Sequence, residues 1–169
     1  MGSVSTVGLH PVVADLWRQI SSLAPSYGFS VVLTSGYRSH EQQAALYQNR
    51  ANNPYPVAPP YTSQHEYGLA MDIRSTPESG ILHNWWVGAG LYHSWGDPIH
   101  YQFFSRAVWS SALQQVFGPQ GPDPEGQPAE VPIPQVYQDP YQLMGLPQSA
   151  YELSQILLAE YGNALGPLP

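Results

Sequence analysis

The chain has 169 residues, which is enough for one folded domain, and no cysteine, so disulfides and cysteine–zinc sites are excluded. Only 10% of the residues are charged, all five basic residues are arginine, and the formal net charge is −7. Nucleic acids and anionic wall polymers are therefore poor partners, because binding to phosphates requires clustered Lys and Arg.

A helix and a strand are the first predicted elements. Pro11 suits the first position of a helix, since proline lacks the N–H that a first turn leaves unused. The apolar face of this helix would carry Val13, Leu16, Trp17 and Ile20. Residues 29–34 are rich in β-branched side chains and predict a strand.

Further short elements follow along the first two thirds of the chain. Ser39 and Gln42 form a capping-box pattern that begins a helix running to about Tyr47. Residues 52–61 read as a proline-rich loop, and two more short strands are expected, at 69–73 and 100–104. Short strands mixed with helices predict an α+β fold, with a small antiparallel sheet flanked by helices.

The composition changes near residue 118. Ten of the eighteen prolines lie from Pro119 to Pro169. We therefore expect a folded domain at 1–117, a proline-rich extended arm at 118–148, and a C-terminal amphipathic helix and tail at 149–169. An amphipathic helix on an arm needs a surface to cover, which is either another protein or the chain's own domain.

Three residues form a candidate metal site. His65, Asp72 and His100 offer two imidazoles and one carboxylate, a ligand set that suits zinc. Three protein ligands leave a fourth position for water, which is typical of catalytic rather than structural zinc. The alternative is structural: Asp72 could instead pair with an arginine, Arg38 or Arg74. We interpret the remaining histidines as structural: His10, His40, His83 and His93.

Two charged residues near these ligands could take part in chemistry. Asp97 lies three residues before His100 and could accept a proton from a zinc-bound water, or it could simply cap a turn. Pro98 favours an extended conformation at Asp97. Arg38, at the end of the first strand, could stabilise an oxyanion or hold a substrate carboxylate, or it could form an ordinary surface ion pair.

The same residues carry a family resemblance. The segment Ser63-x-His65-x-x-Gly68-x-Ala70-x-Asp72 resembles the S-x-H-x-x-G-x-A-x-D signature of the zinc D-alanyl-D-alanine carboxypeptidase family. That family includes vancomycin-resistance D,D-peptidases and phage L-alanyl-D-glutamate endolysins. The stretches 35–47 and 97–103 are similar to it as well, and the resemblance covers roughly residues 10–105.

The resemblance implies a role for each of these residues. It makes His65, Asp72 and His100 the zinc ligands, and it places Arg38 on the substrate carbonyl or carboxylate. It implies substrate-side or supporting positions for Ser63, Gln43 and Tyr37. Many carboxypeptidase members have Glu where this chain has Asp97, and the aspartate form resembles the endolysin branch, in which Asp is the base. Several aromatic residues could line a substrate groove or pack in the core: Tyr67, Trp85, Trp86, Tyr92 and Trp95.

Together these features predict a zinc metallopeptidase that hydrolyses D-amino-acid-containing bonds in peptidoglycan stem peptides. It would act as a D,D-carboxypeptidase or as an L-alanyl-D-glutamate endopeptidase. We expect no signal peptide and no membrane span, so the domain would be mounted on a phage virion through a virion or tail partner of its arm. Two alternatives stay open: a structural virion component that keeps the fold, and a module that binds stem peptides without cutting them.

Overall fold

The computed structural model describes residues 3–78, 80–94 and 96–117. These residues all fall within the predicted 1–117 domain. The predicted arm (118–148) and the predicted C-terminal helix and tail (149–169) lie outside the described residues.

A four-stranded antiparallel sheet organises the described residues, with the strand order β1-β2-β4-β3. The strands are β1 Ser30–Ser35, β2 Ala70–Thr76, β3 Tyr92–Ser94 and β4 Asp97–Gln102. The helices are α1 Pro11–Leu23, α2 His40–Gln48, α3 Gly80–Gly88 and α4 Arg106–Phe117, with short 3-10 turns at Ala24–Tyr27, Arg50–Asn52 and Gln64–Tyr67. The predicted α+β class with a small antiparallel sheet is confirmed.

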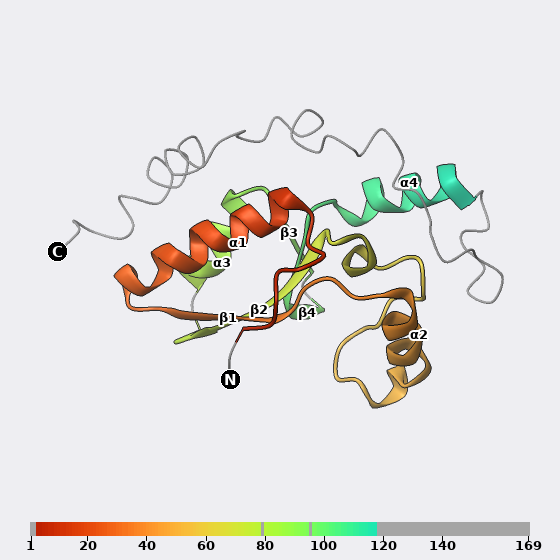
Figure 1. Cartoon of the computed structure of the whole chain (residues 1–169), viewed down its shortest axis with the longest axis horizontal. Coiled ribbons are helices and arrows are strands. Elements are labelled where there is room, and N and C mark those ends of the chain that lie inside the picture. The colour runs from red at the N-terminus through yellow and green to blue at the C-terminus, as the bar shows by residue number, and fades with distance from the viewer. Residues whose placement is uncertain (1–2, 79, 95, 118–169) are drawn as a thin grey trace.

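The core lies between one face of the sheet and helices α1 and α3 (Figure 1). The predicted apolar face of α1 is buried there, and the ring of Trp17 stacks on that of Trp86 at 6.1 Å. Trp85 and Trp86 are each only 1% exposed, so both are core aromatics rather than walls of a groove. Trp95, another groove candidate, lies outside the described residues.

Strand β2 separates the core from the opposite face of the sheet. Side chains alternate between the two faces of a strand, and Met71 and Ile73 are buried in the core. Asp72 and Arg74 therefore point to the other face. The metal-ligand candidates thus lie on the face turned away from α1 and α3.

We expect Trp86→Ala to lower the free energy of unfolding by about 3–5 kcal/mol, because it empties a large buried volume between Trp17 and Tyr101. Urea unfolding followed by circular dichroism measures the effect. Val87→Ala is the matched control, since Val87 is an exposed neighbour on α3 and should change stability by no more than about 0.5 kcal/mol. Similar losses in both variants would contradict the placement of α3.

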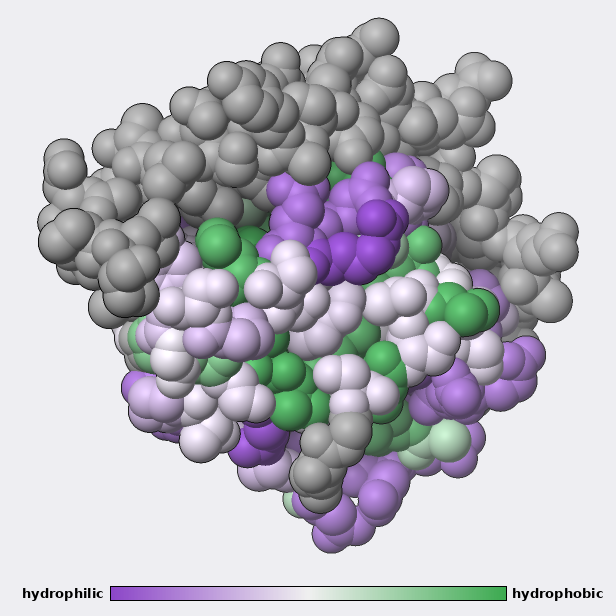
Figure 2. Space-filling model, turned by 60° about the vertical axis from the view of Figure 1, so that its left-hand side comes forward, coloured by the Kyte–Doolittle hydropathy of each residue, from purple (hydrophilic) through white to green (hydrophobic). Residues whose placement is uncertain are grey.

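The surface carries apolar residues in scattered positions. Figure 2 shows one face, on which apolar residues reach the surface in separate places among polar ones. Isolated exposed apolar side chains are normal for a folded domain. Within the part of the chain that the structure describes, no helix has both the length and the apolar character needed to cross a membrane.

Candidate metal centre

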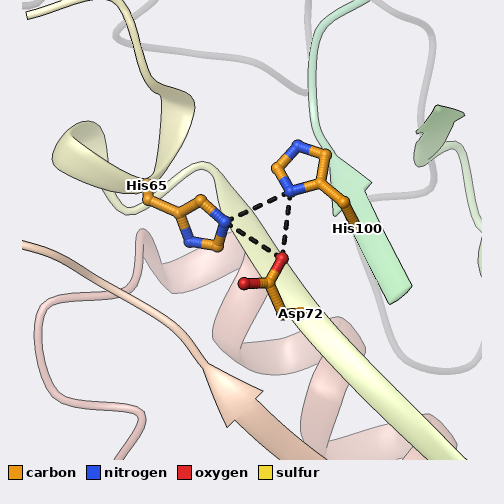
Figure 3. A group of neighbouring side chains, drawn as sticks. All are labelled: His65, Asp72 and His100. Atoms are coloured by element: carbon orange, nitrogen blue, oxygen red, sulfur yellow. Dashed lines mark hydrogen bonds and ion pairs between the residues drawn. The ribbon is translucent and has the colours of Figure 1, made fainter. Parts of the chain in front are cut away.

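His65, Asp72 and His100 converge on one point (Figure 3). The distance from His65 Nε2 to Asp72 Oδ1 is 3.2 Å, that from His65 Nε2 to His100 Nδ1 is 3.2 Å, and that from His100 Nδ1 to Asp72 Oδ1 is 3.1 Å. Asp72 and His100 are direct partners in the pairing of β2 with β4. Sheet register therefore brings together two candidate ligands that are far apart in sequence.

A short capped turn places the third candidate ligand, His65. His65 lies in the 3-10 turn Gln64–Tyr67, whose first N–H groups are capped by Ser63 Oγ, while the Glu66 carboxylate accepts from the Ser63 N–H at 3.1 Å. Gly68 ends the turn with a φ of 70°, and a Cβ there would lie 2.3 Å from the carbonyl oxygen of Gly8. Only glycine fits this position, so the turn leads directly into β2 and holds His65 above Asp72.

The hydrogen bonds at the far sides of the two rings fix which nitrogens face the centre. His65 Nδ1 lies 2.7 Å from the carbonyl oxygen of Gly36 and must donate to it. Gln102 donates its amide to the carbonyl of Phe104 at 2.6 Å, so its Oε1 faces His100 Nε2 at 3.0 Å and accepts from it. In the neutral rings, the nitrogens that face Asp72 therefore present lone pairs.

Three lone-pair groups within 3.2 Å of one another repel unless a cation or a proton lies between them. In a tetrahedral zinc site with bonds of about 2.0–2.1 Å, neighbouring ligand atoms are about 3.3–3.4 Å apart. The observed spacing is close to that value, and the ligand types are those of zinc. The residues present thus fit the metal that the sequence predicts.

The electrostatics of the three residues agree with a cation site. Burial alone would raise the pKa of Asp72, but its contacts with His100 and His65 hold the pKa far below the ordinary value. Burial lowers the pKa of His65. Burial also opposes the charge on His100, yet the hydrogen bond and charge of Asp72 leave its pKa raised. Because Asp72 favours the protonated form of His100, a proton competes with metal for this histidine, so metal affinity should fall as the pH falls.

Arg38 lies at the edge of the cluster and is held in place by three contacts. Its guanidinium donates to Gln43 Oε1 at 2.7 Å and to Ser35 Oγ at 2.9 Å, and it lies 3.5 Å from Asp72 Oδ2. One oxygen of Asp72 thus faces the histidines and the other faces Arg38, so the ion pair and the ligand role are compatible.

The predicted substrate-side residues differ in exposure. Gln43 is 1% exposed and donates to the carbonyl of Ala58, so here it orients Arg38. Ser63 is buried as the cap of the His65 turn. Tyr37, beside Arg38, is 46% exposed and open to a ligand. Contact of Gln43, Ser63 or Tyr37 with a substrate stays a prediction.

Asp97, the candidate base, begins β4 and is partly buried. Burial and the nearby charge of Asp72 raise its pKa above the ordinary value for Asp. Its Oδ1 is buried and has no hydrogen-bond partner among the described residues. A carboxylate oxygen of this kind, within the field of His65 and His100, is suited to accept a proton.

Sequence reasoning missed Gln102 and the partner of His40. Gln102 lies two residues after His100 on the same face of β4, a spacing that could have indicated its role. His40 pairs with the buried Glu66 at 2.6 Å, and His10 accepts from the Val12 N–H at the start of α1, as expected of structural histidines.

We expect Gln102→Leu to weaken zinc binding about 10–100-fold, because residues that orient a ligating histidine affect metal affinity by such factors. Competition with a chromogenic chelator measures the dissociation constant. Gln114→Leu is the matched control on the exposed side of α4 and should leave the affinity unchanged. Equal affinities in wild type and Gln102→Leu would contradict this role for Gln102.

Comparisons with known proteins agree with the geometry. The family model for VanY, D-alanyl-D-alanine carboxypeptidase, matches residues 6–99, a range that contains His65 and Asp72 and ends just before His100. The peptidoglycan L-alanyl-D-glutamate endopeptidase CwlK of Bacillus subtilis is 33% identical over 77 residues, which are 44% of this chain and 46% of CwlK. The chain therefore matches less than half the length of this curated relative.

Two solved structures are also similar. One is the vancomycin resistance D,D-pentapeptidase VanY in complex with Zn(II), with a TM-score of 0.45 and 19% identity over 64% of this chain and 80% of that one. The other is the LD-carboxypeptidase LdcB, with a TM-score of 0.46 and 23% identity over 72% of this chain and 83% of that one.

Proposed function

The chain belongs to the D-alanyl-D-alanine carboxypeptidase family, and from this premise we propose that it is a zinc-dependent peptidase acting on peptidoglycan stem peptides. The observation that carries the proposal is the triangle of lone pairs from His65, Asp72 and His100, because these groups repel one another unless a cation or a proton lies between them. The bonds cut would be those that contain D-amino acids, as the name of CwlK states for that relative.

The roles of the surrounding residues follow from their positions. Zinc held by the three ligands would supply Lewis acidity. Asp97 would take the proton of the attacking water and pass it to the leaving amine. Arg38 would balance the negative charge that develops on the carbonyl oxygen, since it is held near the ligands by Ser35 and Gln43.

Between the two reaction types, an aspartate at position 97 favours endopeptidase action, because this form resembles the endolysin branch of the family. The similarity to the endopeptidase CwlK supports the same choice. We therefore propose cleavage between L-alanine and D-glutamate as the first reaction to test, with removal of a terminal D-alanine as the second.

Mass spectrometry of purified peptidoglycan after digestion with zinc-loaded protein tests this function. New termini at one stem-peptide bond, absent when Asp97→Ala protein is used, are expected, and they identify the bond. Stem peptides left intact across several wall chemotypes would favour the binding module, which should retain stem peptides in a pull-down.

We also propose that the domain acts from a phage virion, on the basis of its resemblance to phage endolysins and the proline-rich segment at 118–148. Detection of the chain in purified virions by mass spectrometry is the expected result. Its presence only in lysates of infected cells would contradict this placement.

A further inference from the structure

We infer that Arg74 binds a second carboxylate of the substrate, away from the cleaved bond, and so selects stem peptides by their free carboxyl groups. This inference rests on the proposed peptidase function. It concerns a residue outside the metal ligands, Asp97 and Arg38.

The first argument is position. Arg74 follows Asp72 by two residues on β2, and the burial pattern of the strand places both on the face turned away from the core. Two strand residues span about 6.6 Å. Consider an extended peptide that lies along β2 with its cleaved bond at the candidate ligands. The residue two positions from that bond would then lie beside Arg74.

The second argument is that the guanidinium of Arg74 is available. Arg74 is exposed, and its guanidinium forms no ion pair or hydrogen bond within the described residues. Arg38, by contrast, is already engaged by Gln43, Ser35 and Asp72. The other arginines lie elsewhere, on or beside helices: Arg18 on α1, Arg50 after α2 and Arg106 on α4. Arg74 is thus the second cation on the face of the sheet that carries the site.

The third argument is charge. Residues 1–117 hold six carboxylates and five arginines, so the domain has almost no net charge and local cations decide whether an acidic peptide is attracted to the site. D-Glutamate in a peptide retains one free carboxyl group, and a terminal D-alanine adds another. In the proposed function, Arg38 serves the carbonyl or carboxylate at the cleaved bond. A guanidinium with all its donors free can take a second carboxylate in a two-bond arrangement.

The experiment uses a panel of synthetic stem peptides in which each free carboxyl group is amidated in turn. We expect Arg74→Gln to lower kcat/KM on the fully ionised peptide about 10–100-fold, mainly through KM, because a charge-assisted hydrogen bond is lost. For one amidated peptide, this difference between wild type and variant should disappear. Arg74→Lys should recover part of the preference. Arg106→Gln, which removes an exposed arginine from α4, is the matched control and should behave as wild type.

The outcomes distinguish a failure of the Arg74 inference from a failure of the proposed peptidase function. A loss in Arg74→Gln that is equal for all peptides would overturn the inference, since a structural role does not depend on one carboxyl group. Unchanged kinetics would overturn it as well. If the wild type cuts no peptide, the proposed function fails. Calorimetry with the same peptides and zinc-loaded protein then tests the role of Arg74 alone. The inference stands if wild type binds the ionised peptide more tightly than Arg74→Gln does, and it fails if the two bind equally.

Discussion

Asp97→Ala protein is expected to retain zinc and to lose peptidase activity by about 10²–10⁴-fold in kcat, the usual contribution of a general base. The expectation follows from the position of Asp97, which is near the ligands yet not one of them, with a buried oxygen that has no partner among the described residues. Steady-state kinetics on the cleaved stem peptide and metal analysis of the same preparation measure both properties.

Asp97→Asn is the control for shape, because it keeps the side-chain volume and removes the base. It should be as inactive as Asp97→Ala. Activity within a few-fold of wild type in Asp97→Asn would show that the proton goes elsewhere. Loss of zinc from either variant would instead indicate that Asp97 helps to hold the metal.

The pH dependence of kcat/KM has a predictable sign. Asp97 must be ionised to accept a proton, so activity is lost as the pH falls through its pKa. Burial and the charge of Asp72 raise that pKa, whereas a bound dication lowers it. Below zinc saturation the acid limb should lie at higher pH than at saturation, because a proton also competes with zinc for His100 as the pH falls.

The grouping of His65, Asp72 and His100 could be predicted from sequence because it depends on few residue types at fixed spacings. The spacing of His65 and Asp72 around Gly68 reflects a capped turn that enters a strand, and the structure has that turn. His100 is different, since it reaches Asp72 through the register of β4 against β2. Register depends on side-chain packing across the sheet, so the residues alone offered His100 only as a candidate.

The limits of β4 show why boundaries are harder to predict. A strand was expected at 100–104, but β4 spans Asp97–Gln102. Proline lacks an N–H and therefore argues against a strand. Pro98, however, lies outside the part of β4 that pairs with β2, because that pairing ends at His100. Phe104 leaves the strand because its backbone bonds to the buried Gln64 amide. Such long-range contacts leave no local signal in the sequence.

The contacts that prepare the site were the least predictable. The direction of the lone pairs on His65 and His100 depends on the Gly36 carbonyl and on Gln102, and neither stands out by composition. Helices α3 and α4 were not predicted, although α3 contributes two buried tryptophans to the core. Of the two contacts, the one with Gly36 joins residues 29 apart in sequence, whereas Gln102 lies two residues after His100.

Asp72→Asn is expected to abolish both zinc binding and activity without unfolding the protein. An amide has no charge to balance the metal, and it can turn its NH₂ group toward the histidine nitrogens, which relieves the repulsion among the lone pairs. Thermal unfolding with and without zinc measures this directly. At a zinc concentration 1,000 times the dissociation constant, wild type should gain about 4 kcal/mol, and Asp72→Asn should gain nothing. Equal zinc-dependent stabilisation of the two proteins would mean that the metal binds elsewhere, and the lone-pair triangle would then need a proton rather than zinc.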